Sequence, residues 1–521
     1  MRVDNTEPEG PEGPGGAVGR RVRCGEERAT VRYVGPVPPT AGPWLGVEWD
    51  DPDRGKHDGS HEGVQYFTCR HATGGSFVRP AKASFGEDFL SALRKQYHVD
   101  TDEVQSEDGP IPLEWRGLRE RSFESLQSVL LDGREVNGPG AEGEIRRTTP
   151  NVQLLDLSKT LLSCWDDVGT ITQQLDRLRE LRLSSNRLRL PSDPSRLCGT
   201  FSSLKTLSLI SCELTWPQIL QCAPMWPQLE DLCVKGNSIT ELQRPDGVLQ
   251  NLRTLDLSGN VLLQDTVLLS LSALLRLEHL DLSDTGLSVI RFDDAAHGSP
   301  TAMFPALKDL MLDYNNITEW FVVDELDKLP SLVKLSCRGN RLTSSDGNRK
   351  TADQILIAKL GRLVILNGCT IHPKERRGAE LDYMKIFGGE WLKSGGRSQT
   401  STEFAHQHPR FQSLVDKYGA PEEGELKKQR SSALKSQLIK ITFMFPDDGE
   451  QTPIEKKLPA TMLVEKVKGL LHRLLKVPAA DLRLSYTCTK KPGTEYEIDS
   501  NLKTLHFYSV QDGDQVLVRW S

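Results

Sequence analysis

Leucines recur at one spacing through the middle of the chain, and this repeat predicts the architecture of that region. The template is L-x-x-L-x-L-x-x-N, with mostly polar residues at x, and successive copies begin 23 to 30 residues apart. Such a period is typical of solenoids, in which each repeat adds one short strand and returns through a loop or helix. Close copies begin at residues 178, 229, 252, 307 and 332, and weaker copies at 152, 204 and 277.

The segments before the repeats have a different pattern. Residues 17–85 contain ten glycines and short β-branched runs such as 29–34, which predict a small all-β barrel. Apolar residues at 89–97 then follow at helical spacing. The acidic stretch 100–112 is interpreted as a linker, so residues 86–149 are expected to form a helix and a linker. Residues 1–16, rich in Glu, Pro and Gly, are expected to be disordered.

Alternation of apolar and polar residues returns in the last part of the chain, residues 437–521. It predicts a strand at 439–445 and a final strand at 516–520 after an Asp-Gly turn. Between them Thr461 is the expected N-cap of a helix. The apolar face of that helix comprises Leu463, Val464, Val467, Leu470, Leu471 and Leu474.

Residues 388–436 are rich in Gly, Ser and charge and predict a partly helical linker, with one amphipathic piece at 411–418. His406 and His408 lie in this segment and are expected to be solvated.

Composition and charge limit the classes of function that this chain can have. A chain of 521 residues predicts several domains, and its net charge of −7 argues against general nucleic-acid binding. The ten cysteines include no C-x-x-C pair, so a reduced cytosolic compartment is expected, with no metal site and no cofactor. We expect no signal peptide and no membrane span, because the N-terminus lacks an apolar segment and no long uncharged apolar run occurs.

One loop combines a cation with flanking glycines and aromatics. Gly55-Lys56-His57-Asp58-Gly59 is a tight turn that presents donors beside an apolar wall, and Trp44, Phe67 and Phe77 supply the wall. Backbone N–H groups and a Lys suit an extended peptide that ends in a carboxylate. A solvated turn is the other interpretation, and Trp49 and Tyr66 are either core or site residues.

Over residues 17–85 these motifs resemble the CAP-Gly domain, which binds the acidic, aromatic-ended tail of α-tubulin. The resemblance implies a peptide-binding site formed by Trp44, Gly55, Lys56, His57, Asp58, Gly59, Phe67 and Phe77. Lys56 would face the acid groups of the ligand. The family usually has Asn where this chain has His57, so the contact made by that amide would be altered or pH-sensitive here.

The repeats resemble a leucine-rich repeat solenoid of α/β class, with a C-terminal cap near 363–380, over residues 150–387. In such an array the turn Asn satisfies backbone groups, and residues beside the strand leucines face the concave surface. A docking stripe for a protein client would then comprise Asp231, Asp256, Asp281, Asp309 and Asp313. Asp256 and Asp281 are expected to be neighbours of like charge. A merely solvated face is the other interpretation.

Residues 437–521 resemble the ubiquitin-like β-grasp, an α+β fold. Enzyme signatures are missing: the Gly-Lys pair at 55–56 lacks the spacing of a phosphate loop, and no G-x-S-x-G or H-E-x-x-H motif occurs. We therefore expect a binding protein without catalytic residues.

The module order resembles that of the tubulin-folding cofactors. This implies a cytoplasmic, cytoskeleton-associated chaperone that binds α-tubulin. It would act with other cofactors, including the one that binds β-tubulin, in assembling and dissociating the heterodimer. The ubiquitin-like domain would dock another cofactor or the proteasome. Two alternatives stay open: an adaptor for the microtubule lattice, which would use the same tail site, and a proteasome-linked shuttle.

Overall fold

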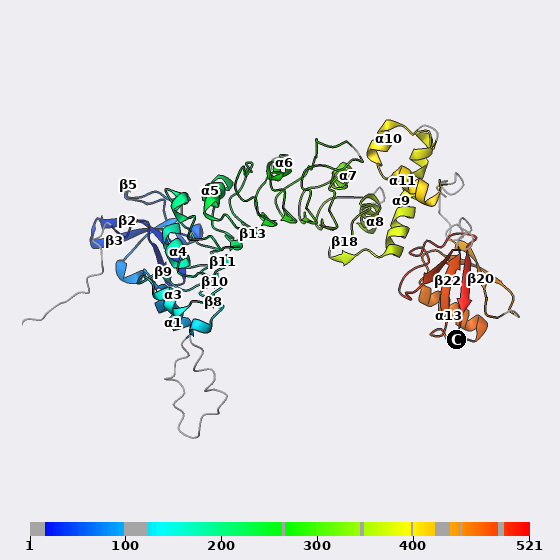
Figure 1. Ribbon diagram of the computed structural model, residues 1–521, viewed down its shortest axis with the longest axis horizontal. Coiled ribbons are helices and arrows are strands. Elements are labelled where there is room, and N and C mark those ends of the chain that lie inside the picture. The colour runs from blue at the N-terminus through cyan, green and yellow to red at the C-terminus, as the bar shows by residue number, and fades with distance from the viewer. Residues whose placement is uncertain are drawn as a thin grey trace, which may run out of the picture. The chain divides into compact units, whose positions relative to one another are not determined.

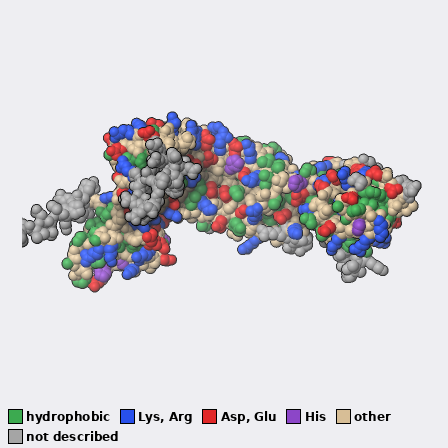
Figure 2. All heavy atoms as spheres, turned by 90° about the horizontal axis from the view of Figure 1, so that it is seen from below, with side chains coloured by type: hydrophobic (Ala, Val, Ile, Leu, Met, Phe, Trp, Pro, Cys, Tyr) green, Lys and Arg blue, Asp and Glu red, His purple; other side chains and the backbone are tan. Residues whose placement is uncertain are grey.

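The computed structural model describes residues 16–97, 123–262, 266–296, 298–343, 349–397, 400–421, 438–448, 451–487 and 494–520. The expected disordered N-terminus (almost all of it), the linker at 100–112 and residues 422–436 of the second linker lie outside the described residues. The chain divides into two compact units, which are Met1–Ser288 with Met303–Asn315, and Val289–Ala302 with Asn316–Ser521. Charged side chains of both signs are interspersed on the face shown in Figure 2.

The first unit begins with a four-stranded antiparallel sheet. Its order is β1-β2-β3-β6, where β1 is Arg21–Cys24, β2 Glu27–Val37, β3 Thr40–Trp49 and β6 Gly75–Val78. Val22, Ala29, Val31, Leu45, Val47 and Trp49 form its core. The hairpin of β4 (Ser60–His61) and β5 (Val64–Gln65) follows the 3-10 helix η1 (Pro52–Arg54). The 3-10 helix η2 (Pro80–Lys82) follows β6.

A connecting segment joins this sheet to the repeats. Strand β7 (Glu87–Asp88) pairs in parallel with β9 (Val136–Gly138), and α1 (Phe89–Tyr97) buries Phe89, Leu90 and Leu93, which confirms the predicted helix. The elements η3 (Phe123–Ser125), β8 (Ser128–Leu130) and α3 (Glu144–Thr148) complete the segment.

The repeats of the first unit lay down parallel strands in register. These are β10 (Leu154–Asp156), β11 (Glu180–Arg182), β12 (Thr206–Ser208), β13 (Asp231–Cys233), β14 (Thr254–Asp256), β15 (His279–Asp281) and β16 (Asp309–Met311). The central leucines, from Leu155 to Leu310, pair strand to strand and are at most 1% exposed. Strand β8 pairs with β10, so the sheet begins before the first predicted repeat.

Short helices return the chain between these strands. They are α4 (Trp165–Thr172), η4 (Pro194–Leu197), α5 (Trp216–Cys222), η5 (Ala223–Met225) and α6 (Val267–Leu271). In Figure 1, α5 and α6 lie on the opposite edge of the repeats from strands such as β13. The turn asparagines have the predicted structural role. Asn186, for example, donates to the carbonyls of Leu157 and Leu183 at 2.7 and 3.0 Å.

The second unit contains β17 (Lys334–Ser336), which pairs in parallel with β18 (Ile365–Leu366), and β19 (Cys369–Thr370). Its helices are α7 (Trp320–Leu326), α8 (Arg349–Lys359), α9 (Pro373–Lys393), α10 (Thr402–Gln407) and α11 (Phe411–Tyr418).

Part of the expected linker at 388–436 instead forms a packed helical core. Phe404, Phe411, Leu414 and Val415 are buried against Tyr383 and Trp391 of α9. His408 is only 7% exposed and lies 2.6 Å from the Tyr383 hydroxyl, so the expectation that it is solvated is wrong, whereas His406 is exposed. Aromatic side chains supply enough buried area to order this segment despite its polar composition.

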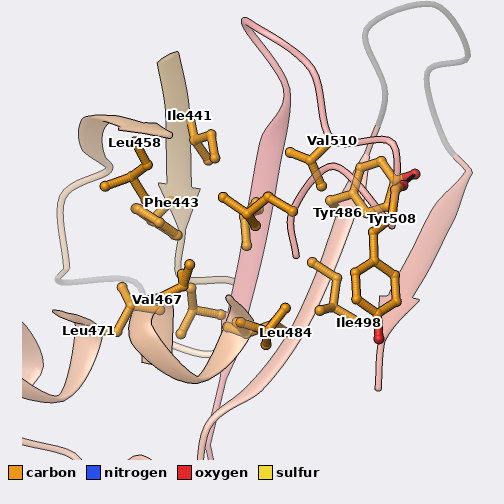
Figure 3. Packing of buried hydrophobic residues seen from close by; sticks show 14 of the residues in the cluster. Ile441, Phe443, Leu458, Val467, Leu471, Leu484, Tyr486, Ile498, Tyr508 and Val510 are labelled. Carbon is orange, nitrogen blue, oxygen red and sulfur yellow. Dashed lines mark hydrogen bonds between the residues drawn. The ribbon is translucent and has the colours of Figure 1, made fainter. Parts of the chain in front are cut away.

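The last part of the second unit is a five-stranded mixed sheet with one helix. The order is β21-β20-β24-β22-β23, with β20 at Leu438–Met444, β21 at Ile454–Pro459, β22 at Arg483–Thr487, β23 at Glu495–Ile498 and β24 at Gln515–Arg519. Figure 3 shows the core, where Val467 and Leu471 of α13 (Val464–Leu475) pack against Phe443 and Leu484. The prediction of Thr461 as N-cap is wrong, because the helix begins at Val464. The N-cap position is occupied by Leu463, which forms an isolated β-bridge with Thr504.

Candidate peptide-binding site

The loop Gly55–Gly59 is held against the start of β6. Lys56 donates its backbone N–H to the Gly75 carbonyl at 2.7 Å, and Gly75 donates to the His57 carbonyl at 2.7 Å. A Cβ at Gly55 would lie 1.9 Å from the Thr73 carbonyl oxygen, and one at Gly59, where φ is +102°, would lie 2.0 Å from the Phe67 carbonyl oxygen. The backbone therefore passes too close to its neighbours for any residue but glycine at these two positions.

Aromatic rings gather beside this loop around Phe77. Ring centroids lie 5.1 Å from Phe77 for His57, 5.5 Å for Phe67 and 5.4 Å for Tyr66. His61 at 6.2 Å and Tyr33 at 6.4 Å complete the set, which we call the ring cluster. The structure thus brings together His57, Phe67 and Phe77, and it places Tyr66, for which the sequence allowed two roles, in the same cluster.

His57 has a defined tautomer. Its Nδ1 accepts the backbone N–H of Gly59 at 3.0 Å, so the proton of the neutral ring is on Nε2. Burial lowers the pKa of His57, Asp58 opposes this, and His61 and Lys56 lower the pKa further. The ring is therefore a neutral hydrogen-bond donor near pH 7.

The two charged residues of the loop differ in role. Lys56 is exposed, and no ion pair joins its ammonium group to any described residue. Asp58 accepts hydrogen bonds from the backbone N–H and hydroxyl of Ser60, which lower its pKa. Asp58 therefore shapes the turn, and Lys56 is the group that can pair with a ligand carboxylate.

Trp44 lies apart from the ring cluster. Its indole is covered by the Arg79 guanidinium, 3.8 Å from the ring centroid, and its Nε1 donates to the Thr40 hydroxyl at 2.8 Å. Among the described residues no ring contact joins it to Phe67 or Phe77. Tyr33 and His61 belong to the ring cluster although no sequence motif marked them as site residues.

The five predicted aspartates of the concave surface occupy different rows of the parallel sheet. Asp256 and Asp281 are direct partners, as predicted, whereas Asp231 pairs with Thr254 and Asp309 with His279. Asp313 lies beyond the end of β16. Burial raises the pKa of Asp281; a hydrogen bond from Ser283 opposes this, and Asp256 adds to it. Among the five predicted aspartates, only Asp256 and Asp281 therefore lie directly opposite each other on adjacent strands.

Two further properties concern the described residues as a whole. No helix in the described parts of the chain is long and apolar enough to cross a membrane. Within the same residues, His, Cys, Asp and Glu side chains do not assemble into a group of three that could hold a metal ion.

Comparisons with known proteins agree with this architecture at both ends of the chain. Residues 18–83 match the CAP-Gly domain family, and residues 444–519 match the ubiquitin-like domain family. One solved structure, the C-terminal ubiquitin-like domain of mouse tubulin-specific chaperone e, is 48% identical over 18% of this chain and 94% of that chain, with a TM-score of 0.16.

Relatives from several animals match the chain almost end to end. The chain is 57% identical over 517 residues to Tubulin-specific chaperone E of Danio rerio, which covers 97% of this chain and 99% of the relative. It is 48% identical over 519 residues to Tubulin-specific chaperone E of Homo sapiens, which covers 96% of this chain and 98% of the relative. Because the identity is high over nearly the full length of both, the chain belongs to the tubulin-specific chaperone E family.

Proposed function

We propose that the protein binds the acidic, aromatic-ended C-terminal tail of α-tubulin through its CAP-Gly domain. Together with other tubulin-folding cofactors, including the one that binds β-tubulin, it acts in assembling and dissociating the α/β-tubulin heterodimer. The relatives are named chaperones, which favours a role without catalysis.

The observation that carries the tail-binding proposal is the exposed Lys56 ammonium beside the ring cluster. Lys56 would pair with the terminal carboxylate, and Nε2 of His57 would donate a hydrogen bond to the ligand. Phe67 and Phe77 would receive the last side chain of the peptide, while Gly55 and Gly59 hold the loop in place.

The parallel repeats would supply a second surface. We propose that residues 150–387 form a leucine-rich repeat solenoid that docks the folded body of the client on its concave face. Residues 17–85 and 437–521 would be the CAP-Gly and ubiquitin-like domains, and the latter would dock another cofactor or the proteasome. We expect a cytoplasmic, cytoskeleton-associated protein.

Fluorescence anisotropy with a labelled α-tubulin tail peptide and the full chain tests the tail site. Removing the final Tyr of the peptide is expected to weaken binding, and Lys56→Ala is expected to weaken binding of the intact peptide by about tenfold, as for a charge-assisted contact. Lys82→Ala, an exposed lysine in η2, is the matched control. Equal affinity for the intact and truncated peptides would refute the proposal.

A further inference from the structure

A shallow pocket of about 460 Å³ lies next to the ring cluster and contains two arginines. It is lined by Arg32, Glu48, Phe67, Thr68, Cys69 and Arg70. Phe67 belongs to both, since its ring centroid lies 5.5 Å from that of Phe77. The pocket therefore borders the proposed tail site at Phe67.

A β-bulge explains why an arginine lies on this face of the sheet. In the β2–β3 pair, Val31 is opposite Val47 and Tyr33 is opposite Gly46, so Arg32 is the extra residue. A bulge re-aims the side chains that follow it. Val31 remains in the core, whereas the Tyr33 ring joins the ring cluster and the Arg32 guanidinium reaches Glu48.

Glu48 holds both guanidinium groups in place. It is 3% exposed and accepts from Nε of Arg32 at 2.8 Å, and from the backbone N–H and Nε of Arg70 at 2.9 and 3.0 Å. Burial would raise the pKa of Glu48, but the hydrogen bonds from Arg70 and Arg32 outweigh it and lower the pKa to about 2. The carboxylate is charged at neutral pH and neutralises one of the two cations.

Donor groups remain for a ligand. A guanidinium has five N–H donors. Among the described residues, Nη1 of Arg32 and Nη2 of Arg70 make no hydrogen bond or ion pair, and the two side chains are 39% and 44% exposed. Nη1 of Arg70 pairs with Glu213 of the repeats, which is also paired with Arg187.

We propose that this pocket is a second subsite of the tail site, where Arg32 and Arg70 bind acidic side chains that precede the terminal aromatic residue of the peptide. This inference rests on the proposed function. An extended peptide rises about 3.3 Å per residue, so the side chains one and two positions before the terminal residue can reach past Phe67 into the pocket. Glu48 is the positioning residue, and Glu213 is an internal carboxylate that competes for Arg70.

Two short labelled peptides, ending in Glu-Glu-Tyr and Gln-Gln-Tyr, test the subsite against the full chain by anisotropy. The acidic peptide is expected to bind about 5–10-fold more tightly, since each exposed charge pair contributes roughly 0.2–1 kcal/mol. In Arg32→Gln this ratio is expected to fall to about 2-fold, while the affinity for the neutral peptide is unchanged. Glu213→Gln is expected to raise the affinity for the acidic peptide about 2-fold.

Arg79→Gln is the matched control, because Arg79 belongs to the same domain but stacks on Trp44 outside the pocket. An unchanged ratio in Arg32→Gln, or an equal fall in Arg79→Gln, would overturn the subsite. If both peptides bind the wild-type protein equally well, the subsite fails and the tail site stands. If neither peptide binds, the proposed function itself fails.

Discussion

Replacing Asn186 by alanine should open the repeats locally, because one buried amide connects two successive turns. The side chain is fully buried and takes part in four hydrogen bonds. Its Nδ2 donates to the carbonyls of Leu157 and Leu183, and its Oδ1 accepts from the backbone N–H and the hydroxyl of Thr160 at 2.9 and 3.0 Å. Alanine removes all four bonds and leaves backbone groups unpaired in the interior.

The magnitude follows from this count of bonds. A hydrogen bond contributes about 1 kcal/mol net, and an unsatisfied buried group costs about 1–3 kcal/mol. The free energy of local unfolding of the repeats is therefore expected to fall by roughly 3–5 kcal/mol in Asn186→Ala. Hydrogen exchange measured by mass spectrometry on peptides that cover residues 154–187 suits a multidomain chain, for which a single unfolding free energy is poorly defined. Protection in these peptides should fall by about 100-fold or more.

Asn151→Ala is the control for this experiment. Its side chain donates one exposed hydrogen bond, to the Glu124 carbonyl at 2.8 Å, so protection should fall less than about 10-fold. If Asn186→Ala and Asn151→Ala lost equal protection, the turn asparagine would not be the connection between repeats, and the structural role assigned to the template Asn would be refuted.

Two further predictions concern acid stability and the concave surface. Burial, with a smaller effect from Lys359, lowers the pKa of His408 to about 3, whereas the pKa of an unfolded histidine is near 6.5. The stability that the neutral ring contributes is therefore fully present above about pH 6.5. It is lost at about 1.4 kcal/mol per pH unit as the pH falls from there toward 3. Protection factors in α9–α11, which correct for the slower intrinsic exchange at lower pH, should therefore fall on acidification in the wild type and less steeply in His408→Gln. An equal pH dependence of the protection factors in both proteins would contradict this origin. Replacing Asp256 and Asp281 together by Lys should weaken binding of the tubulin dimer in a pull-down, whereas Asp246→Lys, at an exposed site, should not; unchanged binding in the double variant would eliminate the docking stripe.

The repeats could be predicted because the leucine spacing in the sequence gives their period directly. Each copy places one leucine at the centre of a strand, and these leucines pair in register from Leu155 to Leu310. The earlier strand β8 was missed although Leu126, Val129 and Leu131 fit the template. Arg134 stands where the other copies have Asn, Thr or Cys, so the residue that marks the end of a copy is absent there.

The candidate site was predictable only where its residues are close in sequence or belong to a recognisable motif. Lys56 and His57 lie in one turn, and Phe67 and Phe77 follow in the order of the family. Tyr33 and Arg32 reach the site through a bulge, and nothing in the alternation of β2 signals an extra residue. The stacking of Arg79 on Trp44 could not be predicted either, because the two residues are 35 positions apart in sequence.

The contacts between the CAP-Gly domain and the repeats sharpen the argument for two-site binding. Arg187 of the repeats pairs with Asp50 at 2.9 Å and donates to the Asp50 carbonyl at 2.8 Å. Arg23 pairs with Glu135, in the connecting segment, at 2.8 Å. Burial lowers the pKa of Arg187 to about 10, which still leaves its guanidinium charged at neutral pH.

A flexible linker raises effective concentration by confining a second site within its reach, and the gain falls as the linker lengthens. A domain held by direct ion pairs instead presents its groove in one orientation to the repeats. A client whose tail and body match that orientation gains from both sites, and a client with the same tail on another body gains from only one. Selectivity among tubulin-like clients would therefore depend on this interface as much as on the groove.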